Sequence, residues 1–311
     1  MVAVRHRSKY CALEFFRIAR RIKPTSDLII RTLTSSDLPR ADEILSSAFG
    51  FSESRQPELQ RYLRLQPDGW FIGAQANGLP VAMVGAVNYG AFAYVGMMAV
   101  HQDSQRQGLG LRLMVHLLAD LQAKNCPIVL LDASASGRPF YLQLGFIEEG
   151  LANVYLLPYY DPLFYLTGCQ VELIQSADLP GLAAYDRPIF GADRSKFLKM
   201  LLDDLPGRAF LTRSSSGQIN GFLFAQPGGR IGPWLANNPQ DAGKLLNAAL
   251  ALPYDQVMPW VISPSSNKDA ELLLFEAGFI FERCCTHMRL GGQRHPGQRT
   301  QIYGQHSLAI G

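Results

Sequence analysis

The chain has 311 residues, of which 48% are hydrophobic and 18% charged, and its 29 Lys and Arg against 26 Asp and Glu give a formal net charge of +3. This length suggests two domains, the composition is too apolar for a disordered protein, and the nearly balanced charge gives no reason to expect a nucleic-acid partner or an acidic membrane surface. No apolar run reaches the ~18–20 residues of a membrane span, and five cysteines without a C-x-x-C pair predict neither a disulfide framework nor a zinc site. We therefore expect no metal, no membrane and a reducing, cytoplasmic location.

Residues 1–26 are interpreted as a basic N-terminal extension that precedes the fold. The segment has seven Lys and Arg residues between positions 5 and 23 but only one acidic residue, Glu14, and it lacks the apolar core of a secretory signal. A transit peptide or a nucleic-acid-binding arm remains an alternative to a surface-docked or poorly ordered extension.

The next 130 residues alternate between strand and helix patterns. Ser36 and Asp37 suit the start of one helix, Asn77-Gly78 predicts a hairpin turn, and a leucine-rich stripe at i, i+3, i+4 spacing predicts another helix. In chain order we expect a strand at 28–33, helices at 38–47 and 57–65, strands at 70–75, 79–87 and 91–100, a helix at 108–123, a strand at 128–132, a helix at 137–144, and a final strand from 146.

The second half of the chain repeats the first. Five pairs of short segments recur in the same order, with offsets that fall from 141 to 133 residues. They are 36–39 with 177–180, 48–50 with 189–191, 67–71 with 206–210, 75–78 with 214–217, and 144–146 with 277–279. We therefore predict one unit at 27–160 and a shortened second copy at 168–311, joined by an apolar stretch that lets the copies pack together. The segment 302–310 is expected to close the sheet of copy two.

The sharpest local feature is a turn that leads from the apolar strand ending at Val100 into a helix. Gly108 and Gly110 leave the backbone accessible at the helix N-terminus, where unpaired amides and the helix dipole attract a pyrophosphate, and Arg106 adds positive charge. A Rossmann loop would need a third glycine where Leu113 stands, and the P-loop sequence is absent.

This region resembles the GNAT superfamily of N-acetyltransferases. Gln105-x-x-Gly108-x-Gly110 is similar to its acyl-CoA loop, and Tyr141-x-x-x-Gly145-Phe146 is similar to its tyrosine-bearing helix and the turn after it. The stretch from Leu131 to Pro139 is typical of a subgroup with a second, GNAT-like domain at the C-terminus. The resemblance implies an α+β fold, with two tandem domains that each contain a mixed, mostly antiparallel sheet flanked by helices.

The resemblance also implies roles for individual residues. The backbone of Met98, Ala99 and Val100 would pair with the pantetheine arm of acetyl-CoA, and an amide there would hold the thioester oxygen. The loop would bind the pyrophosphate through Gln105, Arg106, Gln107, Gly108, Leu109, Gly110 and Leu111. Ser134 takes the place of a cofactor-contacting asparagine, and Tyr141 would protonate the leaving thiolate. The general base stays open between a water chain, His101 and a carboxylate of copy two.

Copy two lacks these features. Its loop counterpart has no Gly-x-Gly but carries Pro233, Pro239 and Asp241, and Leu274-Phe275 replaces Phe140-Tyr141, so we expect it to bind no CoA and to serve as structural cover and part of the acceptor site. Asp186, Arg187 and Trp234 are candidate substrate contacts, with an Asp–Arg surface network and simple packing as alternatives.

The predicted function is therefore N-acetyl transfer from acetyl-CoA, as co-substrate, to a primary amine of a small molecule, directly within a ternary complex. A non-catalytic acyl-CoA sensor and an acyltransferase for longer acyl chains are the alternatives, and the oligomeric state is left open.

Overall fold

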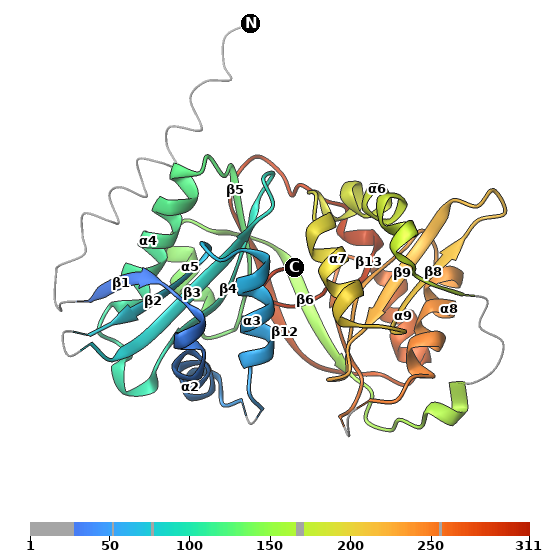
Figure 1. Cartoon of the computed structure of the whole chain (residues 1–311), viewed down its shortest axis with the longest axis horizontal. Helices are drawn as coiled ribbons and strands as arrows, with labels where there is room; N and C mark the ends of the chain where they lie inside the picture. Colours follow the sequence, from blue (N-terminus) through green and yellow to red (C-terminus); the bar gives the residue numbers. More distant parts are fainter. Residues whose placement is uncertain (1–27, 52, 76–77, 166–170, 255–256) are drawn as a thin grey trace, which may run out of the picture.

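A computed structural model describes residues 28–51, 53–75, 78–165, 171–254 and 257–311, so the basic extension 1–26 and Asn77 of the expected hairpin turn lie outside the described residues (Figure 1). The helices of copy one are α2 (Leu38–Phe49), α3 (Gln56–Leu65), α4 (Leu109–Ala123) and α5 (Arg138–Gln143). Its strands are β1 (Ile29–Thr32), β2 (Trp70–Ala74), β3 (Pro80–Asn88), β4 (Ala93–Val100), β5 (Ile128–Ala133) and β6 (Ile147–Leu156). Each expected element of copy one is confirmed, with its ends shifted by at most two residues.

Copy two has the same order of elements. Its helices are α6 (Leu179–Phe190), α7 (Ser195–Asp204), α8 (Pro239–Leu250) and α9 (Lys268–Glu276). Its strands are β7 (Glu172–Leu173), β8 (Ala209–Arg213), β9 (Ile219–Ala225), β10 (Arg230–Ala236), β11 (Trp260–Pro264), β12 (Ile280–Gly291) and the additional β13 (Ile302–Gly304). None of the helices in the described ranges has the length and apolar character that a bilayer crossing requires.

The two copies share one sheet. Within the described residues thirteen strands join in the order β1-β2-β3-β4-β5-β12-β6-β11-β10-β9-β8-β7, with β13 added beside β10. β1 to β6 of copy one correspond in order to β7 to β12 of copy two. When each strand is replaced by its counterpart, the strand order is the same from either end of the sheet. The expectation of one sheet per copy is therefore corrected, because each copy has given its last strand to the other.

The exchange places two long strands at the centre of the molecule. Figure 1 shows β6 and β12 between the two halves. β12 pairs antiparallel with β5 on one side and with β6 on the other, and β6 then pairs antiparallel with β11. Separating the copies without re-pairing their last strands would leave those strands unpaired and would expose the row of amides and carbonyls along β5 or β11, which is costly. The exchanged strands thus hold the copies together through backbone hydrogen bonds.

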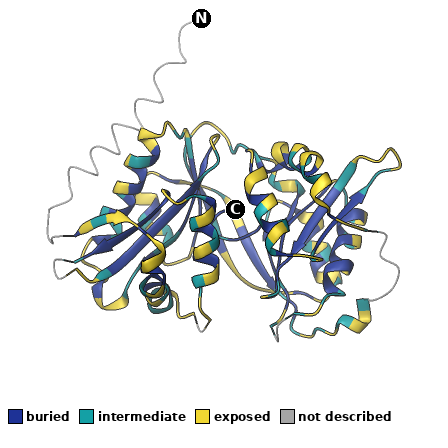
Figure 2. Ribbon diagram, in the orientation of Figure 1, coloured by how far each residue is buried: buried dark blue, intermediate teal, exposed yellow. Residues whose placement is uncertain are grey.

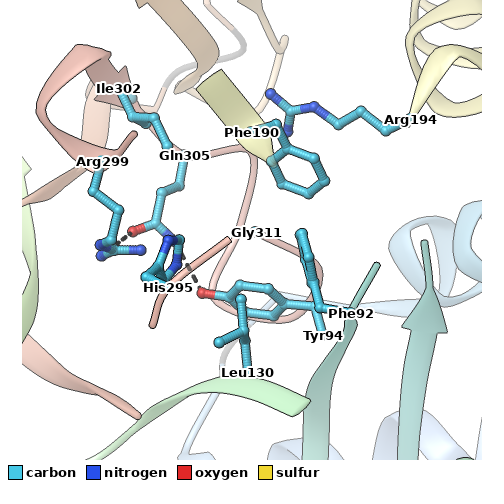
Figure 3. Close-up of a pocket in the computed structure, with 11 residues that line it drawn as sticks. Phe92, Tyr94, Leu130, Phe190, Arg194, His295, Arg299, Ile302, Gln305 and Gly311 are labelled. Atoms are coloured by element: carbon cyan, nitrogen blue, oxygen red, sulfur yellow. Dashed lines mark hydrogen bonds between the residues drawn. The ribbon is translucent and has the colours of Figure 1, made fainter. Parts of the chain in front are cut away.

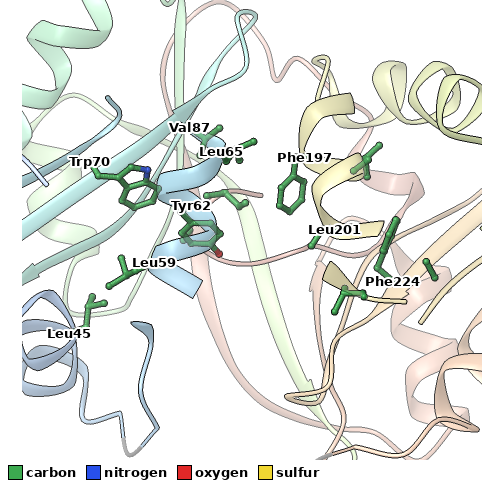
Figure 4. Packing of buried hydrophobic residues seen from close by; sticks show 14 of the residues in the cluster. Leu45, Leu59, Tyr62, Leu65, Trp70, Val87, Phe197, Leu201 and Phe224 are labelled. Atoms are coloured by element: carbon green, nitrogen blue, oxygen red, sulfur yellow. The ribbon is translucent and has the colours of Figure 1, made fainter. Parts of the chain in front are cut away.

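Side-chain packing joins the copies on one face of this sheet. Most of the inner strands of the two halves are dark blue in Figure 2, whereas the outer faces of the helices are yellow. One buried cluster contains Tyr62 and Leu65 of α3 together with Phe197 and Leu201 of α7 (Figure 4). Tyr62, Phe197 and Leu201 are 0% exposed, and burying side chains of this size contributes ~1.5–3 kcal/mol each.

A buried ion pair lies at the edge of this cluster and links the copies electrostatically. Arg230 Nη1 of β10 donates to Glu58 Oε1 of α3 at 2.9 Å, and Tyr62 Oη donates to the same oxygen at 2.5 Å. Arg55 also pairs with Glu58. Burial alone would raise the pKa of Glu58, but Arg230 and Arg55 outweigh it and hold that pKa well below its usual range.

We predict that Glu58→Gln destabilises the protein by about 3–5 kcal/mol at neutral pH, because it leaves Arg230 buried without its countercharge. The folded-state pKa of Glu58 lies below its unfolded-state value of ~4.3, so its ionisation contributes stability above that pH and the contribution is lost as the pH falls. In urea unfolding, the difference in the free energy of unfolding between the parent protein and the variant should therefore become smaller towards pH 3.

The matched control is Glu43→Gln, which removes an ion pair with Arg40 whose glutamate side chain is 62% exposed. Its effect should stay below about 1 kcal/mol. If Glu58→Gln and Glu43→Gln lowered the free energy of unfolding equally, a stabilising role of the buried Glu58–Arg230 pair would be contradicted.

Candidate active site

The candidate site begins where β4 and β5 separate. These strands pair in parallel only through Ala93–Val95 and residues 129–131, after which β4 continues to Val100 with β3 as its one strand partner. Met98, Ala99 and Val100 therefore line an edge of β4 that faces no strand of the described chain. This open edge is where the sequence predicts the pantetheine arm.

A bulge distorts β4 at the start of the open edge. Gly85 pairs with Gly96 and Met83 with Ala99, so β4 carries one residue more than β3 over this interval. Met97 takes up the extra length with φ = 53°, a left-handed conformation that is uncommon for a residue with a long side chain. Such a bulge turns backbone groups away from the regular ladder and is frequent beside active sites.

The predicted loop follows β4 directly and ends at the N-terminus of α4. Arg106 and Gly108 have φ values of 62° and 74°, and Gly108 has no atom within 4 Å of the position a Cβ would take. In the described part of the chain, no acceptor takes a hydrogen bond from the amides of residues 108–111, and Gly108 provides no side-chain cap. Residues 105–108 are exposed. The loop thus presents free amides beside Arg106, as an anion site requires.

Two contacts hold this loop against the strand. Gln105 does not extend outward, because its Nε2 donates to the carbonyl of Val100 at 3.1 Å. A Cβ on Gly110 would come within 2.9 Å of Met98 Cε, so glycine allows the first turn of α4 to lie close to β4. These contacts bring the free amides next to the open edge.

Tyr141 lies on α5, on the face of the sheet that α4 covers. It is 9% exposed, its ring packs edge-on against Phe140 and Phe146, and its hydroxyl has no hydrogen-bond partner among the described residues. Burial raises its pKa, so the hydroxyl keeps its proton at neutral pH and is available as a donor. Ser134 is exposed and accepts the amide of Gly137 at 3.1 Å, so its hydroxyl stabilises the turn that precedes α5.

Copy two has the same separation of strands, but the chain itself fills it. β10 and β11 pair in parallel only at residues 230–231 with 260–261, and β13 then pairs with β10 where Trp234 meets Gly304. The amide of Gln305 donates to the carbonyl of Ile262 on β11 at 2.7 Å, which closes the gap from the other side. At the start of α8, Asn238 accepts the amide of Asp241 at 2.9 Å.

For two of the three candidate substrate contacts the structure favours the alternatives, an Asp–Arg pair and simple packing, although the Asp–Arg pair is buried and not at the surface. Asp186 is 1% exposed and is held by the guanidinium of Arg194 at 2.7 Å, so it forms a buried structural ion pair and not a surface site. Trp234 is 0% exposed and packs against Tyr303, because β10 runs through the core of copy two. Arg187 is exposed in the last turn of α6.

Sequence reasoning missed a buried polar cluster between the copies. Asp132 of β5 accepts Tyr94 Oη at 2.5 Å and Gln305 Nε2 at 3.0 Å, and it contacts His287 Nδ1 of β12 at 2.8 Å. Burial and the charge of Arg299 lower the pKa of His287, so the ring is neutral. Figure 3 shows Tyr94 and Gln305 beside a cavity of about 20 Å³. Only the strand exchange brings His287 to Asp132, and no local pattern signals it.

One of the open alternatives for the general base, His101, can be located. His101 is half-buried at the end of β4, with Nδ1 3.6 Å from Asp103 Oδ2. The alternative expected from copy two was a carboxylate, whereas the group that copy two places beside β5 here is the imidazole of His287, opposite Asp132 in the strand register.

Family models match both copies. The Acetyltransferase (GNAT) family model matches residues 38–146, and an Acetyltransferase (GNAT) domain model matches residues 182–304.

Individual relatives agree with these matches. The chain is 26% identical to the uncharacterised Bacillus subtilis N-acetyltransferase YitH over 191 residues, which are 60% of this chain and 67% of that protein. It is 31% identical to the chloroplastic serotonin N-acetyltransferase 2 of Oryza sativa over 122 residues, covering 38% of this chain and 60% of that enzyme. The match therefore spans less than two thirds of the rice enzyme.

Solved structures extend the likeness over nearly the whole chain. A Pyrococcus horikoshii protein assigned as an acetyltransferase superimposes with a TM-score of 0.78 at 28% identity, covering 91% of this chain and 96% of that one. A GCN5-related N-acetyltransferase from Sphaerobacter thermophilus shares the fold, with a TM-score of 0.66 at 18% identity and coverage of 87% and 98%. From the open edge of β4, the free amides of α4, the repeated architecture and these matches, we conclude that the chain belongs to the GNAT family of N-acetyltransferases and carries two GNAT domains in tandem.

Proposed function

We propose that copy one transfers an acetyl group from acetyl-CoA to a primary amine of a small molecule, directly within a ternary complex. The observation that carries this proposal is the continuity between the open, bulged edge of β4 and the free amides at the start of α4. An extended thioester with a diphosphate at its far end has complementary groups along this whole path.

The loop would bind the diphosphate of CoA. The free amides of residues 108–111 and the dipole of α4 favour negative charge there, and the exposed guanidinium of Arg106 adds to that attraction. Gly108 leaves open space in front of these amides, and Gln105 keeps the loop in place. Both features favour close approach of phosphate oxygens to the backbone.

The edge of β4 at Met98, Ala99 and Val100 that has no neighbouring strand would hold the pantetheine arm as an added strand would be held, with the Val100 carbonyl already taken by Gln105. A thioester supplies an activated acyl group, so the protein mainly needs to position the amine and to control proton positions. An amide at the Met97 bulge would stabilise the charge that develops on the thioester oxygen. Tyr141, protonated because it is buried, would donate its proton to the leaving sulfur.

In this proposal copy two binds no coenzyme. β13 occupies the gap that corresponds to the open edge of copy one, and Asn238 already satisfies an amide where the anion would bind. Copy two would instead cover the sheet of copy one through the exchanged strands and enclose the acceptor. An enclosed acceptor site favours a small amine over a protein tail.

An amine screen tests the proposed function. Acetyl-CoA would be incubated with small primary amines, including serotonin because of the rice relative, and the released thiol would be measured. We expect turnover with at least one amine. Measurable CoA binding without turnover on any of them would contradict the transferase and favour the sensor, whereas faster reaction with longer acyl-CoA esters would favour the alternative acyl group.

Substituting Gly108 tests the diphosphate site. Gly108→Asp places a carboxylate in front of the free amides and should weaken CoA binding at least tenfold in calorimetry, equivalent to about 1.4 kcal/mol. Gly207→Asp is the matched control, since Gly207 also has a positive φ and open space around it but lies in copy two. Parent protein should bind one CoA per chain, and a stoichiometry of two would contradict the proposed role of copy two.

Substituting Tyr141 tests the proton donor. Tyr141→Phe removes the hydroxyl and keeps the ring packing, so kcat should fall ~10²–10⁴-fold while the CoA dissociation constant stays unchanged. Tyr159→Phe, at a side chain that is 90% exposed, serves as the control and should leave both quantities unchanged. An unchanged kcat in Tyr141→Phe would exclude the acid role.

A further inference from the structure

Three potential metal ligands meet between the copies, on elements that lie far apart in the sequence. Glu149 is on β6, His287 is on β12, and His295 is in the loop that follows β12. One ligand atom from each of the three lies within 4.8 Å of the other two. We propose that Glu149, His287 and His295 bind a divalent transition-metal ion, with Zn²⁺ as the preferred ion.

The hydrogen bonds of His287 leave one nitrogen suited to bind a metal. Its Nδ1 contacts the carboxylate of Asp132 at 2.8 Å, and this carboxylate is fixed by Tyr94 and Gln305. With the proton on Nδ1, the lone pair lies on Nε2. A carboxylate behind a histidine in this way is the usual second layer of a metal site, since it orients the ring and raises its basicity.

The other two side chains each have a buried atom that no group in the described residues satisfies. Arg289 Nε donates to Glu149 Oε1 at 2.5 Å, which leaves Glu149 Oε2 without a partner. The amide of Gly297 donates to His295 Nδ1 at 3.1 Å, and His295 Nε2 has no partner. Metal binding at Nε2 would move the ring proton to Nδ1, where the Gly297 carbonyl at 3.4 Å would accept it. Buried polar atoms without partners are costly, and a shared metal ion would satisfy both.

The loop that carries His295 is held in place. The nitrogen of Gln298 donates to the carbonyl of Ile189 at 2.8 Å, and a Cβ on Gly297 would come within 2.5 Å of the same carbonyl oxygen. The backbone around His295 is therefore pinned against the end of α6. The rings of His287 and His295 lie 5.2 Å apart.

Two imidazoles and one carboxylate form a donor set that Zn²⁺ accepts, with a fourth position left for water. Zinc bonds of ~2.0–2.1 Å in a tetrahedron place the ligand atoms about 3.3 Å apart, so the three side chains must draw together by up to about 1.5 Å. Side-chain rotation supplies a movement of this size. The cavity of about 20 Å³ beside His295 has room for the water (Figure 3).

Arg299 competes with the metal for His287. Its Nη1 lies 3.4 Å from His287 Nε2, so a cation already faces the nitrogen that would bind the metal. Metal binding must displace this guanidinium. Removing Arg299, a positive side chain that offers no ligand, should therefore tighten metal binding.

Calorimetry and cobalt absorption test the proposal on tag-free protein stripped with a chelator. The parent protein should bind one Zn²⁺ per chain, show visible d–d bands with Co²⁺, and unfold at a higher temperature when Zn²⁺ is present. His295→Ala and Glu149→Gln should each weaken Zn²⁺ binding at least tenfold, and Arg299→Ala should tighten it several-fold. His116→Ala removes an exposed histidine on α4 and should change nothing.

Three results would contradict the proposed site: the parent protein binds Zn²⁺ no more tightly than His295→Ala does, His116→Ala loses Zn²⁺ binding, or Arg299→Ala binds Zn²⁺ as the parent protein does. Glu149→Gln keeps the shape of the side chain, so it separates loss of a ligand from loss of folding, which circular dichroism checks for every variant.

Discussion

The antiparallel pairing of β6 with β12 is the contact on which the rest of the molecule depends. Because these strands come from different copies, their hydrogen bonds turn two repeat units into one sheet, and they set the position of every element that follows. β12 pairs with β5 and thereby places His287 opposite Asp132. β6 pairs with β11 and so extends the sheet into copy two. The helices pack across the sheet that these backbone hydrogen bonds hold together.

The two copies use this common frame differently. In copy one, β4 separates from β5 and leaves a backbone edge free, with glycine and unpaired amides at its end. In copy two, the segment after β12 returns as β13 and occupies the equivalent edge, so its hydrogen bonds are made within the chain. One fold thus supports one edge without a strand beside it and one edge that β13 occupies.

Local patterns in the sequence were sufficient to predict the elements of copy one, because periodic apolar residues, caps and glycines act within a few positions. The same locality explains why the loop from Gln105 to Gly110 and the tyrosine of α5 could be identified. The strand exchange could not be predicted, since β6 and β12 are repeat counterparts and either could pair with β5. Asp186 was misjudged for a related reason, because its partner Arg194 and the burial of both depend on tertiary packing.

The order of strands also bears on how such a chain could arise. Two identical molecules that exchanged their last strands would form a symmetric dimer with this same order of strands. Joining them end to end by gene duplication would make the association intramolecular and independent of protein concentration. Halves that are fused no longer need to remain identical, and in this chain one half leaves its strand edge open while the other half fills it with β13.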